Sequence, residues 1–351
     1  MKILYALLIM VPITLALRFA GIGGHTAVFV ASAFALVPLA ALLGRATEEV
    51  AIYTGPKIGA LLNATLGNSA ELIITIIALR EGLVEVVKAS IAGSIIGNIL
   101  VVLGLSLLLG GLKNGTQRFD AKAAGTNATM MLLAVAALTV PAVFALGSEE
   151  HRPSATDIEH LSDGVAIVLI VIYGLYLLYT LRSTTPEEEE WSHHGESTMK
   201  LPLAIGLLLG STLAVVVMSE TLVGALEPTA ASWGLTELFV GILLVPFVGN
   251  IAEHLVAVQV AYKNQMDLSL GIAVGSGLQI AVFVAPVLVL ISLFVGPEPM
   301  TLVFSSFELV ALVAAAFIAV LISVDGESNW LEGAELIGLY TILGIAFYFV
   351  P

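Results

Sequence analysis

An amide and a carboxylate stand three residues apart inside an otherwise apolar stretch, TLGNSAELIITIIALR (65–80). Asn68 and Glu71 fall one helical turn apart, with Gly67 directly before them. An ionised side chain at the centre of a membrane helix costs about 2.5–3.5 kcal/mol or more, so a carboxylate kept there is a candidate functional group. The simpler alternative is a carboxyl group that only braces neighbouring helices by hydrogen bonding.

The same pattern occurs a second time, as GNIAEH at residues 249–254. It matches GNSAEL (67–72) at Gly, Asn, Ala and Glu. The offset between these motifs also carries the Ser of AGSIIGN (92–98) onto the Ser of VGSGLQI (274–280). Two matches at one spacing indicate an internal repeat, which makes a purely bracing role less favoured. The paired residues are Asn68 with Asn250, Glu71 with Glu253, and Ser94 with Ser276.

These side chains offer only oxygen ligands, and the chain contains no Cys. Two carboxylates with amide and hydroxyl oxygens suit calcium, and less closely magnesium or manganese, rather than copper or zinc. Two like charges in a low dielectric are expected to hold at least one proton when no metal is bound. Calcium and protons then compete for the same groups, which is the minimum chemistry of an exchanger. The predicted metal ligands are Glu71, Glu253, Asn68, Asn250, Ser94 and Ser276.

The rest of the chain has the composition of a membrane protein. It is 58% hydrophobic and 11% charged, with a mean hydropathy of +1.03, and long apolar runs recur along its whole length. The formal net charge of −14 argues against nucleic acid as a partner. The first apolar run is long and ends near Arg18, so we interpret it as a retained helix rather than a signal peptide. Hydropathy predicts spans at 3–20, 25–48, 56–80, 86–110, 122–146, 163–182, 201–226, 235–262, 268–295, 301–324 and 330–350.

Eleven spans determine how the two motifs are oriented. The motifs lie on the third and eighth helices, so they enter the membrane in opposite senses, as in inverted-repeat transporters. We therefore predict an all-α integral membrane fold with an N-terminal helix, two inverted five-helix repeats, and an acidic segment between helices six and seven. More Lys and Arg residues fall on the N-terminal side, which predicts a cytoplasmic N-terminus and an outward C-terminus. The predicted divisions are 1–22 (first helix), 23–182 (first repeat), 183–200 (acidic cytoplasmic linker) and 201–351 (second repeat).

The paired motifs GNSAE (67–71) and GNIAEH (249–254) resemble the two α-repeat motifs of the cation/proton exchanger (CAX) branch of the calcium/cation antiporter superfamily. The stretches 44–68 and 275–287 are also similar to that branch, as is the acidic PEEEEW segment, so the resemblance covers nearly the whole chain. Sodium/calcium exchangers of the superfamily usually carry Pro before the repeat Glu, and neither copy here has it. The resemblance implies a calcium/proton antiporter whose two motif Glu residues bind calcium and exchange protons.

The resemblance also implies roles for further polar residues. Asn98 and Gln279 match polar positions on the fourth and ninth helices, and Glu48 and Glu220 match acids that line the access route on either side. Both acids could instead be solvated carboxylates at helix ends. His254 matches the His of the second motif, where it could couple to protons or only donate a hydrogen bond to a carbonyl group.

Two more acidic features are candidates for the ion pathway or its regulation. Glu308, in SSFELV (305–310), is a candidate pathway residue, although an anion in the first turn of a helix is also ordinary helix-dipole complementarity. The acids of the linker could be solvated, or could sense calcium as their family counterpart is thought to. These linker acids are Glu187, Glu188, Glu189 and Glu190.

We therefore predict a secondary active transporter, not an enzyme, that exchanges calcium for protons by alternating access and moves calcium out of the cytoplasm. Calcium is its transported substrate and no bound cofactor is expected; membrane lipid is a further partner, and a homo-oligomer is left open. The short termini favour a prokaryotic plasma membrane. Alternatives are a sodium-coupled or manganese-selective exchanger of the same superfamily, and a cation channel. An intramembrane metal-dependent hydrolase is disfavoured because HExxH is absent.

Overall fold

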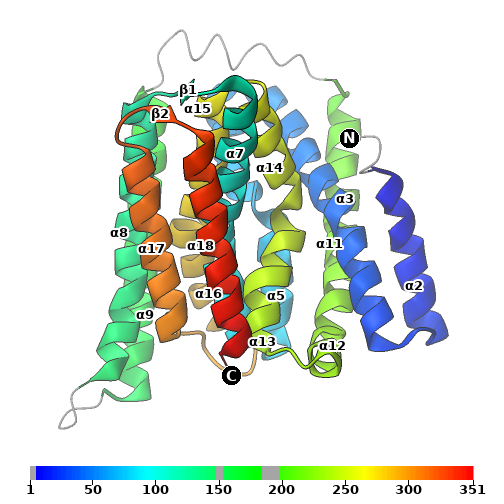
Figure 1. The fold of residues 1–351 in the computed structure, drawn as a ribbon. Coiled ribbons are helices and arrows are strands. Elements are labelled where there is room, and N and C mark those ends of the chain that lie inside the picture. The colour runs from blue at the N-terminus through cyan, green and yellow to red at the C-terminus, as the bar shows by residue number, and fades with distance from the viewer. Residues whose placement is uncertain (1–4, 148–152, 184–197, 351) are drawn as a thin grey trace.

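The computed structural model describes residues 5–147, 153–183 and 198–350, which fold almost entirely into helices (Figure 1). Within these ranges seven helices are long and apolar enough to cross a membrane, or eight if one sharply bent pair is counted as a span. That pair is Leu226–Trp233 with Glu237–Ile251, bent by 111°. The predicted all-α membrane class is confirmed. The count is lower than the predicted eleven because other apolar segments are short or interrupted.

The helices follow one another with few other elements. Those before residue 184 are η1 (Leu7–Ile9), α2 (Met10–Ala20), α3 (Gly24–Thr54), α4 (Pro56–Leu66), α5 (Ser69–Arg80), α6 (Val84–Ile96), π-helical η2 (Gly97–Val102), α7 (Leu103–Asn114), α8 (Ala121–Leu146) and α9 (Ala155–Ser183). Those after it are α11 (Leu201–Gly224), α12 (Leu226–Trp233), α13 (Glu237–Phe239), π-helical η3 (Val240–Leu244), α14 (Val245–Tyr262), α15 (Met266–Gln279), π-helical η4 (Ile280–Val284), α16 (Ala285–Ser292), α17 (Ser306–Ile322) and α18 (Trp330–Phe349). The two-residue strands β1 (Gln117–Arg118) and β2 (Glu327–Ser328), which the hydropathy did not predict, pair antiparallel.

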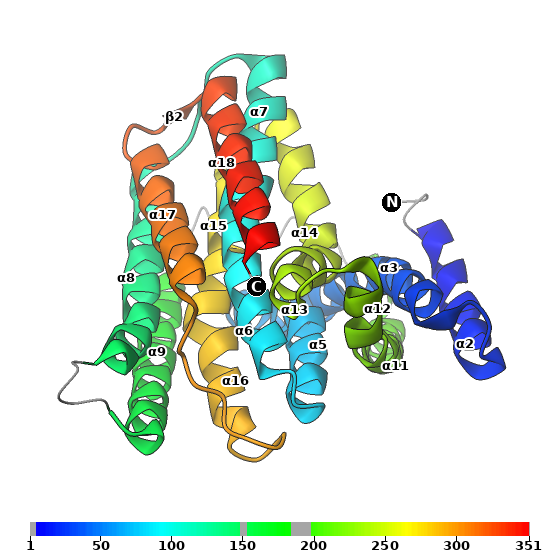
Figure 2. The same ribbon diagram turned by 60° about the horizontal axis from the view of Figure 1, so that its bottom comes forward.

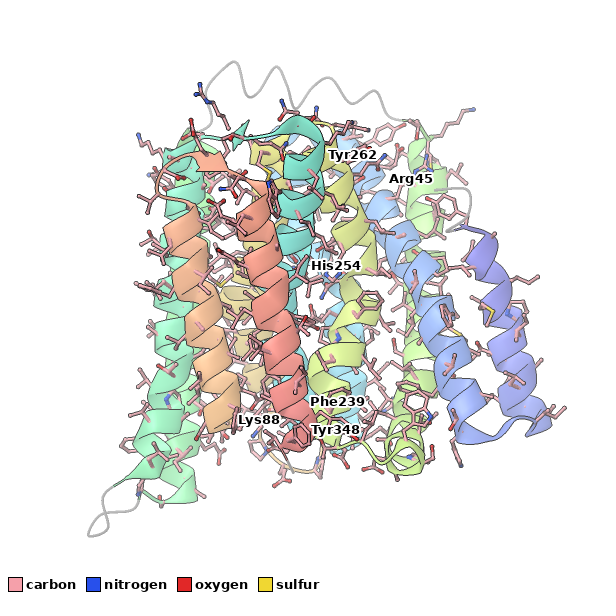
Figure 3. All side chains as sticks on the ribbon, in the orientation of Figure 1. Arg45, Lys88, Phe239, His254, Tyr262 and Tyr348 are labelled. Carbon is pink, nitrogen blue, oxygen red and sulfur yellow. The ribbon has the colours of Figure 1, made fainter. Side chains whose placement is uncertain are left out.

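The bundle has two ends, which we name by residues. Arg45 and Tyr262 lie near one end and Lys88 and Tyr348 near the other, with His254 about halfway between (Figure 3). We call the first end the Arg45 face. We call the second the Glu220 face, because α11 ends there shortly after Glu220 and meets α12 (Figures 1 and 2). Figure 2 also shows α2, α3 and α11 on one side of the bundle, with α8, α9 and α17 on the other.

The two motif glycines occupy different local structures. Gly67 and Asn68 separate α4 from α5; Gly67 keeps right-handed helical dihedral angles, and the chain leaves helical geometry at Asn68. By contrast, α14 runs through Gly249 without interruption. The irregularity there lies one turn earlier, in π-helical η3. It ends two residues before Pro246, which has no backbone N–H to donate.

Helix α9 begins eight residues before the predicted span. Ser154 stands before its first turn, and the Asp157 N–H donates to Ser154 Oγ at 3.1 Å while the Ser154 hydroxyl donates to Asp157 Oδ2 at 2.6 Å. This pairing satisfies a donor of the first turn, so a polar segment that hydropathy assigns to a loop forms helix.

Helix α6 crosses η3 with the two backbones in contact. A Cβ atom added to Gly93 would lie 2.0 Å from the Ile242 carbonyl oxygen, and one added to Gly241 would lie 2.8 Å from Ala89 Cβ. Small residues at such crossings let membrane helices approach closely. Because Ser94 directly follows Gly93, this crossing also sets where Ser94 stands.

Replacing Gly93 with Ala is expected to lower the free energy of unfolding by about 1–3 kcal/mol, because the added methyl group has no space at this crossing. The matched control is Gly97→Ala, where a Cβ meets nothing within 4 Å. Thermal unfolding of the two purified variants in detergent gives the measurement. Equal melting temperatures would contradict the close crossing.

Candidate functional site

The first motif carboxylate is enclosed by three helices. Glu71 lies in the first turn of α5 and is only 2% exposed. It accepts hydrogen bonds from the Ser94 hydroxyl of α6 and from Asn250 Nδ2 of α14, the latter at 3.3 Å. Asn250 Nδ2 also lies 3.2 Å from Ser94 Oγ. The acid of one motif is therefore bound to the amide of the other.

The second motif carboxylate has matching partners. Glu253 of α14 accepts from the Ser276 hydroxyl at 2.9 Å, and the same hydroxyl lies 3.2 Å from Asn68 Oδ1. A hydroxyl group has one hydrogen, so Ser276 donates to one of these acceptors at a time. Asn98 Nδ2 donates to Ser276 Oγ at 3.3 Å, and Asn68 Nδ2 donates to Gln279 Oε1 at 2.8 Å. The structure thus brings all six predicted ligands together with Asn98 and Gln279.

The two halves of the cluster are built alike. In each, a Ser hydroxyl donates to the Glu that lies 23 residues before it. Each motif glycine also lies against the acid of the other motif. A Cβ on Gly67 would stand 3.8 Å from Glu253 Oε1, and a Cβ on Gly249 would stand 3.6 Å from Glu71 Cβ. Glycine at these positions lets the two motifs pack directly against each other.

The chemistry of the cluster is that of a hard-cation site. Among the described residues, no group of three or more His, Cys, Asp or Glu side chains is placed to hold a metal ion. Only two carboxylates are present, and amide and hydroxyl oxygens complete the set. Neutral oxygens added to a few carboxylates are typical of calcium coordination, whereas zinc prefers nitrogen and sulfur ligands.

A cavity of about 810 Å³ connects the cluster with the Arg45 face. Arg45, Glu48 and Gln259 line it, and Glu253 and Ser276 line its inner part. Buried Glu71 is not among its lining residues. A cation arriving from this face would therefore reach Glu253 before Glu71.

Two other predicted acids lie away from the cluster. Glu220 is at the opposite face, where Arg80 Nη2 donates to its carboxylate at 3.1 Å. Glu308 forms the capping box of α17, since its Oε2 accepts from the Ser305 N–H at 2.8 Å. This contact stabilises the first turn of α17, which agrees with the alternative that Glu308 complements the helix dipole.

His254 is half-buried on α14, with its ring centroid 6.3 Å from that of Phe247. The contact is with an aromatic ring rather than with a carboxylate. The linker acids Glu187, Glu188, Glu189 and Glu190 lie outside the described residues.

A buried acid beside Glu48 was missed in the sequence. Glu49 is 5% exposed and accepts hydrogen bonds from the Thr198 and Met199 N–H groups at 3.0 and 3.3 Å. Arg45 Nη2 donates to Thr198 Oγ1 at 3.3 Å, and the Tyr53 hydroxyl donates to the Met199 carbonyl at 2.6 Å. Positions 45, 49 and 53 share one helix face at i, i+4 spacing, and this stripe was the available signal. These hydrogen bonds hold the chain segment before α11 against α3.

Membrane-length helices surround a buried cluster of oxygen ligands, and a cavity leads from that cluster to one face. These features define an integral membrane protein of the ion-transporting class. The chain belongs to the sodium/calcium exchanger protein family, which matches residues 24–182 and 203–349.

Within that family, the chain is similar to several calcium/proton antiporters. The chain is 45% identical to a Ca(2+)/H(+) antiporter of Aphanothece halophytica, over 99% of this chain and 97% of the relative. It is 46% identical to a Ca(2+)/H(+) antiporter of Synechocystis sp., over 100% and 98%. The solved structure of native YfkE matches with a TM-score of 0.85 and 38% identity, over 99% of this chain and 100% of that one. The predicted resemblance to the cation/proton exchanger branch is confirmed.

Proposed function

We propose that this protein is a secondary active transporter that exchanges calcium for protons by alternating access. The observation that carries the proposal is the cluster of the two motif acids. Glu71 accepts from Ser94 and from Asn250 of the other motif, and Glu253 accepts from Ser276, whose hydroxyl also lies against Asn68 of the other motif. The names of the relatives, Ca(2+)/H(+) antiporters, support the pair of exchanged ions.

The contacts suggest how one site would serve both ions. Bound calcium would neutralise both carboxylates and take oxygen ligands from Asn68, Asn250 and the two Ser hydroxyls. When calcium leaves, protons neutralise the same carboxylates, so that neither acid stays charged in the protein interior. A protonated Glu71 would still pair with Ser94, because hydroxyl and carboxyl groups both donate and accept. Exchange then follows from competition for one pair of acids.

The proposal includes the eleven-span, inverted-repeat architecture and its four divisions. In this arrangement α4 and α5 together make one span, interrupted at Gly67, and the short helices α2 and α17 each make another. Helices α6, η2 and α7 form one continuous span, and α15, η4 and α16 form its repeat partner. The similar placement of η2 and η4 after the two Ser-bearing helices supports this pairing.

The remaining site residues take supporting roles in this proposal. With a cytoplasmic N-terminus, the Arg45 face is cytoplasmic, and Glu48 attracts calcium into the cavity. Asn98 and Gln279 hold Ser276 and Asn68 in place. Glu220 serves the opposite face, while Glu187 to Glu190 form the regulatory acidic segment. Any participation of His254 and Glu308 in proton coupling would add to this scheme, which does not depend on it.

Purified protein in sealed vesicles tests the proposal. With an imposed pH gradient, we expect calcium to accumulate against its own gradient while an interior pH dye reports counter-movement of protons. Replacing the pH gradient with a sodium gradient should give no uphill uptake, and a sodium-driven signal would instead favour the sodium-coupled alternative. Calcium that only moves down its gradient would indicate a channel and overturn the proposal. Parallel measurements with manganese compare the uptake rates of the two metals.

A further inference from the structure

A separate pocket lies at the Glu220 face, between helix α2, the start of α3 and the end of α11. Its volume is about 340 Å³, at the lower end of the range for small-molecule sites, which is about 300–1,000 Å³. Its lining includes Leu17 and Arg18 from α2, Gly24 and His25 from α3, and Glu220 and Thr221 from α11. No residue of the ion cluster lines it. The pocket is therefore distinct from the candidate ion site.

The pocket adjoins the lipid-facing surface of the bundle. Helix α2 lies at the outer edge of the molecule, and the turn from α2 into α3 is at the Glu220 face (Figures 1 and 2). Beside the pocket, Phe19 is 83% exposed, and Ile22, which also lines it, is 64% exposed. Exposed apolar side chains on a membrane helix contact lipid acyl chains. A lipid lying along α2 would therefore bring its headgroup to this pocket.

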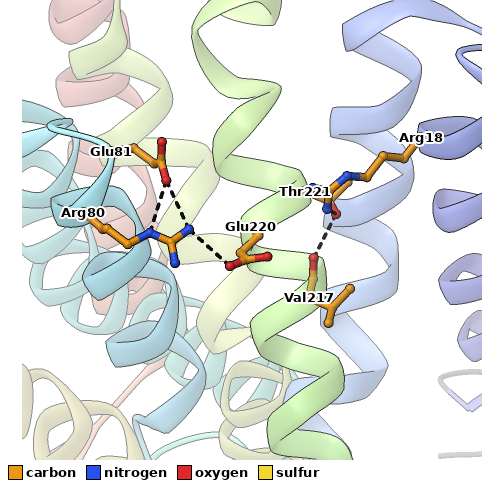
Figure 4. Close-up of polar contacts among 6 residues, drawn as sticks. All are labelled: Arg18, Arg80, Glu81, Val217, Glu220 and Thr221. Carbon is orange, nitrogen blue, oxygen red and sulfur yellow. Dashed lines mark hydrogen bonds and ion pairs between the residues drawn. The ribbon is translucent and has the colours of Figure 1, made fainter.

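The guanidinium group of Arg18 is held in place at the pocket wall. Its Nη1 donates to Thr221 Oγ1 at 2.7 Å, and the Thr221 hydroxyl donates to the Val217 carbonyl at 2.8 Å (Figure 4). Thr221 is buried, so one corner of the guanidinium is oriented by a fixed, neutral acceptor on another helix. Arg has five N–H donors, and Arg18 forms no ion pair with any described carboxylate. Its charge and most of its donors stay available to a ligand.

The carboxylate of Glu220, which also lines the pocket, already has a cationic partner. Arg80 Nη2 of α5 donates to it at 3.1 Å, on the side of α11 away from Arg18 (Figure 4). Arg80 also contacts Glu81 at 3.1 Å, and Glu81 does not line the pocket. Because Arg80 offsets the charge of Glu220, Arg18 makes the pocket attractive to an anion.

The start of α3 adds backbone donors to the same pocket. No side chain caps this helix, so its first N–H groups, including that of His25, lack partners within the helix. Such a helix end favours anions. Gly24 has a φ of 69°, and a Cβ there or at Gly224 of α11 would meet nothing within 4 Å. The helix end and the free space at these glycines support the site that the pocket and Arg18 define.

We propose that this pocket binds the phosphate group of an anionic phospholipid, with Arg18 as its charged donor and His25 beside it. Arg is suited to phosphate because its planar fork can donate two parallel hydrogen bonds. The acyl chains lie against the exposed side chains of Phe19 and Ile22, which is why a lipid rather than a free anion is the ligand. A lipid bound here contacts α2, α3 and α11 together.

The purified protein in a neutral detergent is titrated with phosphatidylglycerol, and native mass spectrometry gives the apparent dissociation constant of the first bound lipid. We expect Arg18→Gln to bind this lipid about tenfold more weakly, because hydrogen bonds between charged groups are among the stronger ones. Arg118→Gln is the matched control and should bind as the parent does. Arg118 is an exposed Arg on β1, at the Arg45 face and away from the pocket (Figure 1).

Two further variants separate the charge of the site from its shape. Arg18→Lys keeps the charge and loses the paired donors, so it should bind more tightly than Arg18→Gln and more weakly than the parent. Gly224→Leu keeps Arg18 but fills the pocket from α11, where a side chain has free space. It should weaken binding about as much as Arg18→Gln does. Binding equal to that of the parent in both Arg18→Gln and Gly224→Leu would overturn the proposal.

Two competitors identify which part of the lipid is recognised. Diacylglycerol has acyl chains but no phosphate and should not displace phosphatidylglycerol. Inorganic phosphate has no acyl chains and should displace it only at a concentration at least about a hundredfold higher, since it lacks the apolar contacts. Displacement by diacylglycerol would show that only the chains are bound, and displacement by phosphate as effective as by the lipid would show a site for free anions. Either result would overturn the lipid assignment. Calcium transport is not measured in these titrations, so their outcome is independent of the proposed function.

Discussion

Glu71→Gln is expected to reduce calcium/proton exchange by at least about a hundredfold, equivalent to roughly 2.8 kcal/mol of lost interaction. The substitution keeps the shape of the side chain and removes one of the two charges that calcium must meet. It also removes the group that would take up a proton when calcium leaves. Calcium binding and proton uptake therefore both lose the Glu71 carboxylate. The loss should appear as slower calcium uptake when a pH gradient drives transport.

The fold should survive this change. A Gln carbonyl oxygen at position 71 can accept from Ser94, and a flip of the Asn250 amide turns its oxygen towards the new NH₂ group. The matched control is Glu335→Gln, an exposed acid on α18 far along the chain from either motif. Glu253→Gln should behave like Glu71→Gln. Retention of near-normal exchange by both motif variants, with protein levels and melting temperatures unchanged, would remove the paired acids from the mechanism.

The sequence was informative about which residues would meet, because a repeat constrains both copies at once. One offset relates Glu71 to Glu253 and Ser94 to Ser276, and the structure brings these four into one cluster. What the sequence could not provide was the difference between the two copies. Glu71 is buried behind its partners while Glu253 lines the open cavity, and this difference depends on the packing of helices that lie far apart in the sequence.

Helix boundaries were less predictable than the class of the fold. Hydropathy measures the membrane-embedded part of a helix, so it missed the polar first turns of α9, which a Ser154–Asp157 cap sustains. The two motif glycines are alike in the sequence, but helix α4 ends just before Gly67 whereas α14 continues through Gly249. Glu49 was missed because its partners, Thr198 and Met199, lie about 150 residues away, and no local pattern specifies them.

Calcium affinity is expected to fall steeply as the pH is lowered. Metal binding requires deprotonated carboxylates and so releases any protons that the empty pair holds. Each proton released per calcium ion changes the apparent dissociation constant about tenfold per pH unit, and two protons change it about a hundredfold. Acid therefore weakens binding, and affinity becomes independent of pH only where the empty cluster is already deprotonated. This sign is what lets an acidic compartment drive calcium away from the site.

Calorimetric titration of the purified protein with calcium, at several pH values and in buffers of different ionisation enthalpy, counts the protons released. Glu71→Gln and Glu253→Gln should each lower the count and flatten the dependence on pH, because one exchangeable carboxyl group remains. His254→Gln separates the imidazole from the acids: an unchanged count assigns the protons to the carboxyl pair, and a lower count adds His254 to the coupling. An affinity that does not vary with pH in the parent would mean that calcium and protons occupy different groups, and the single-site exchange scheme would then fail even if both ions are transported.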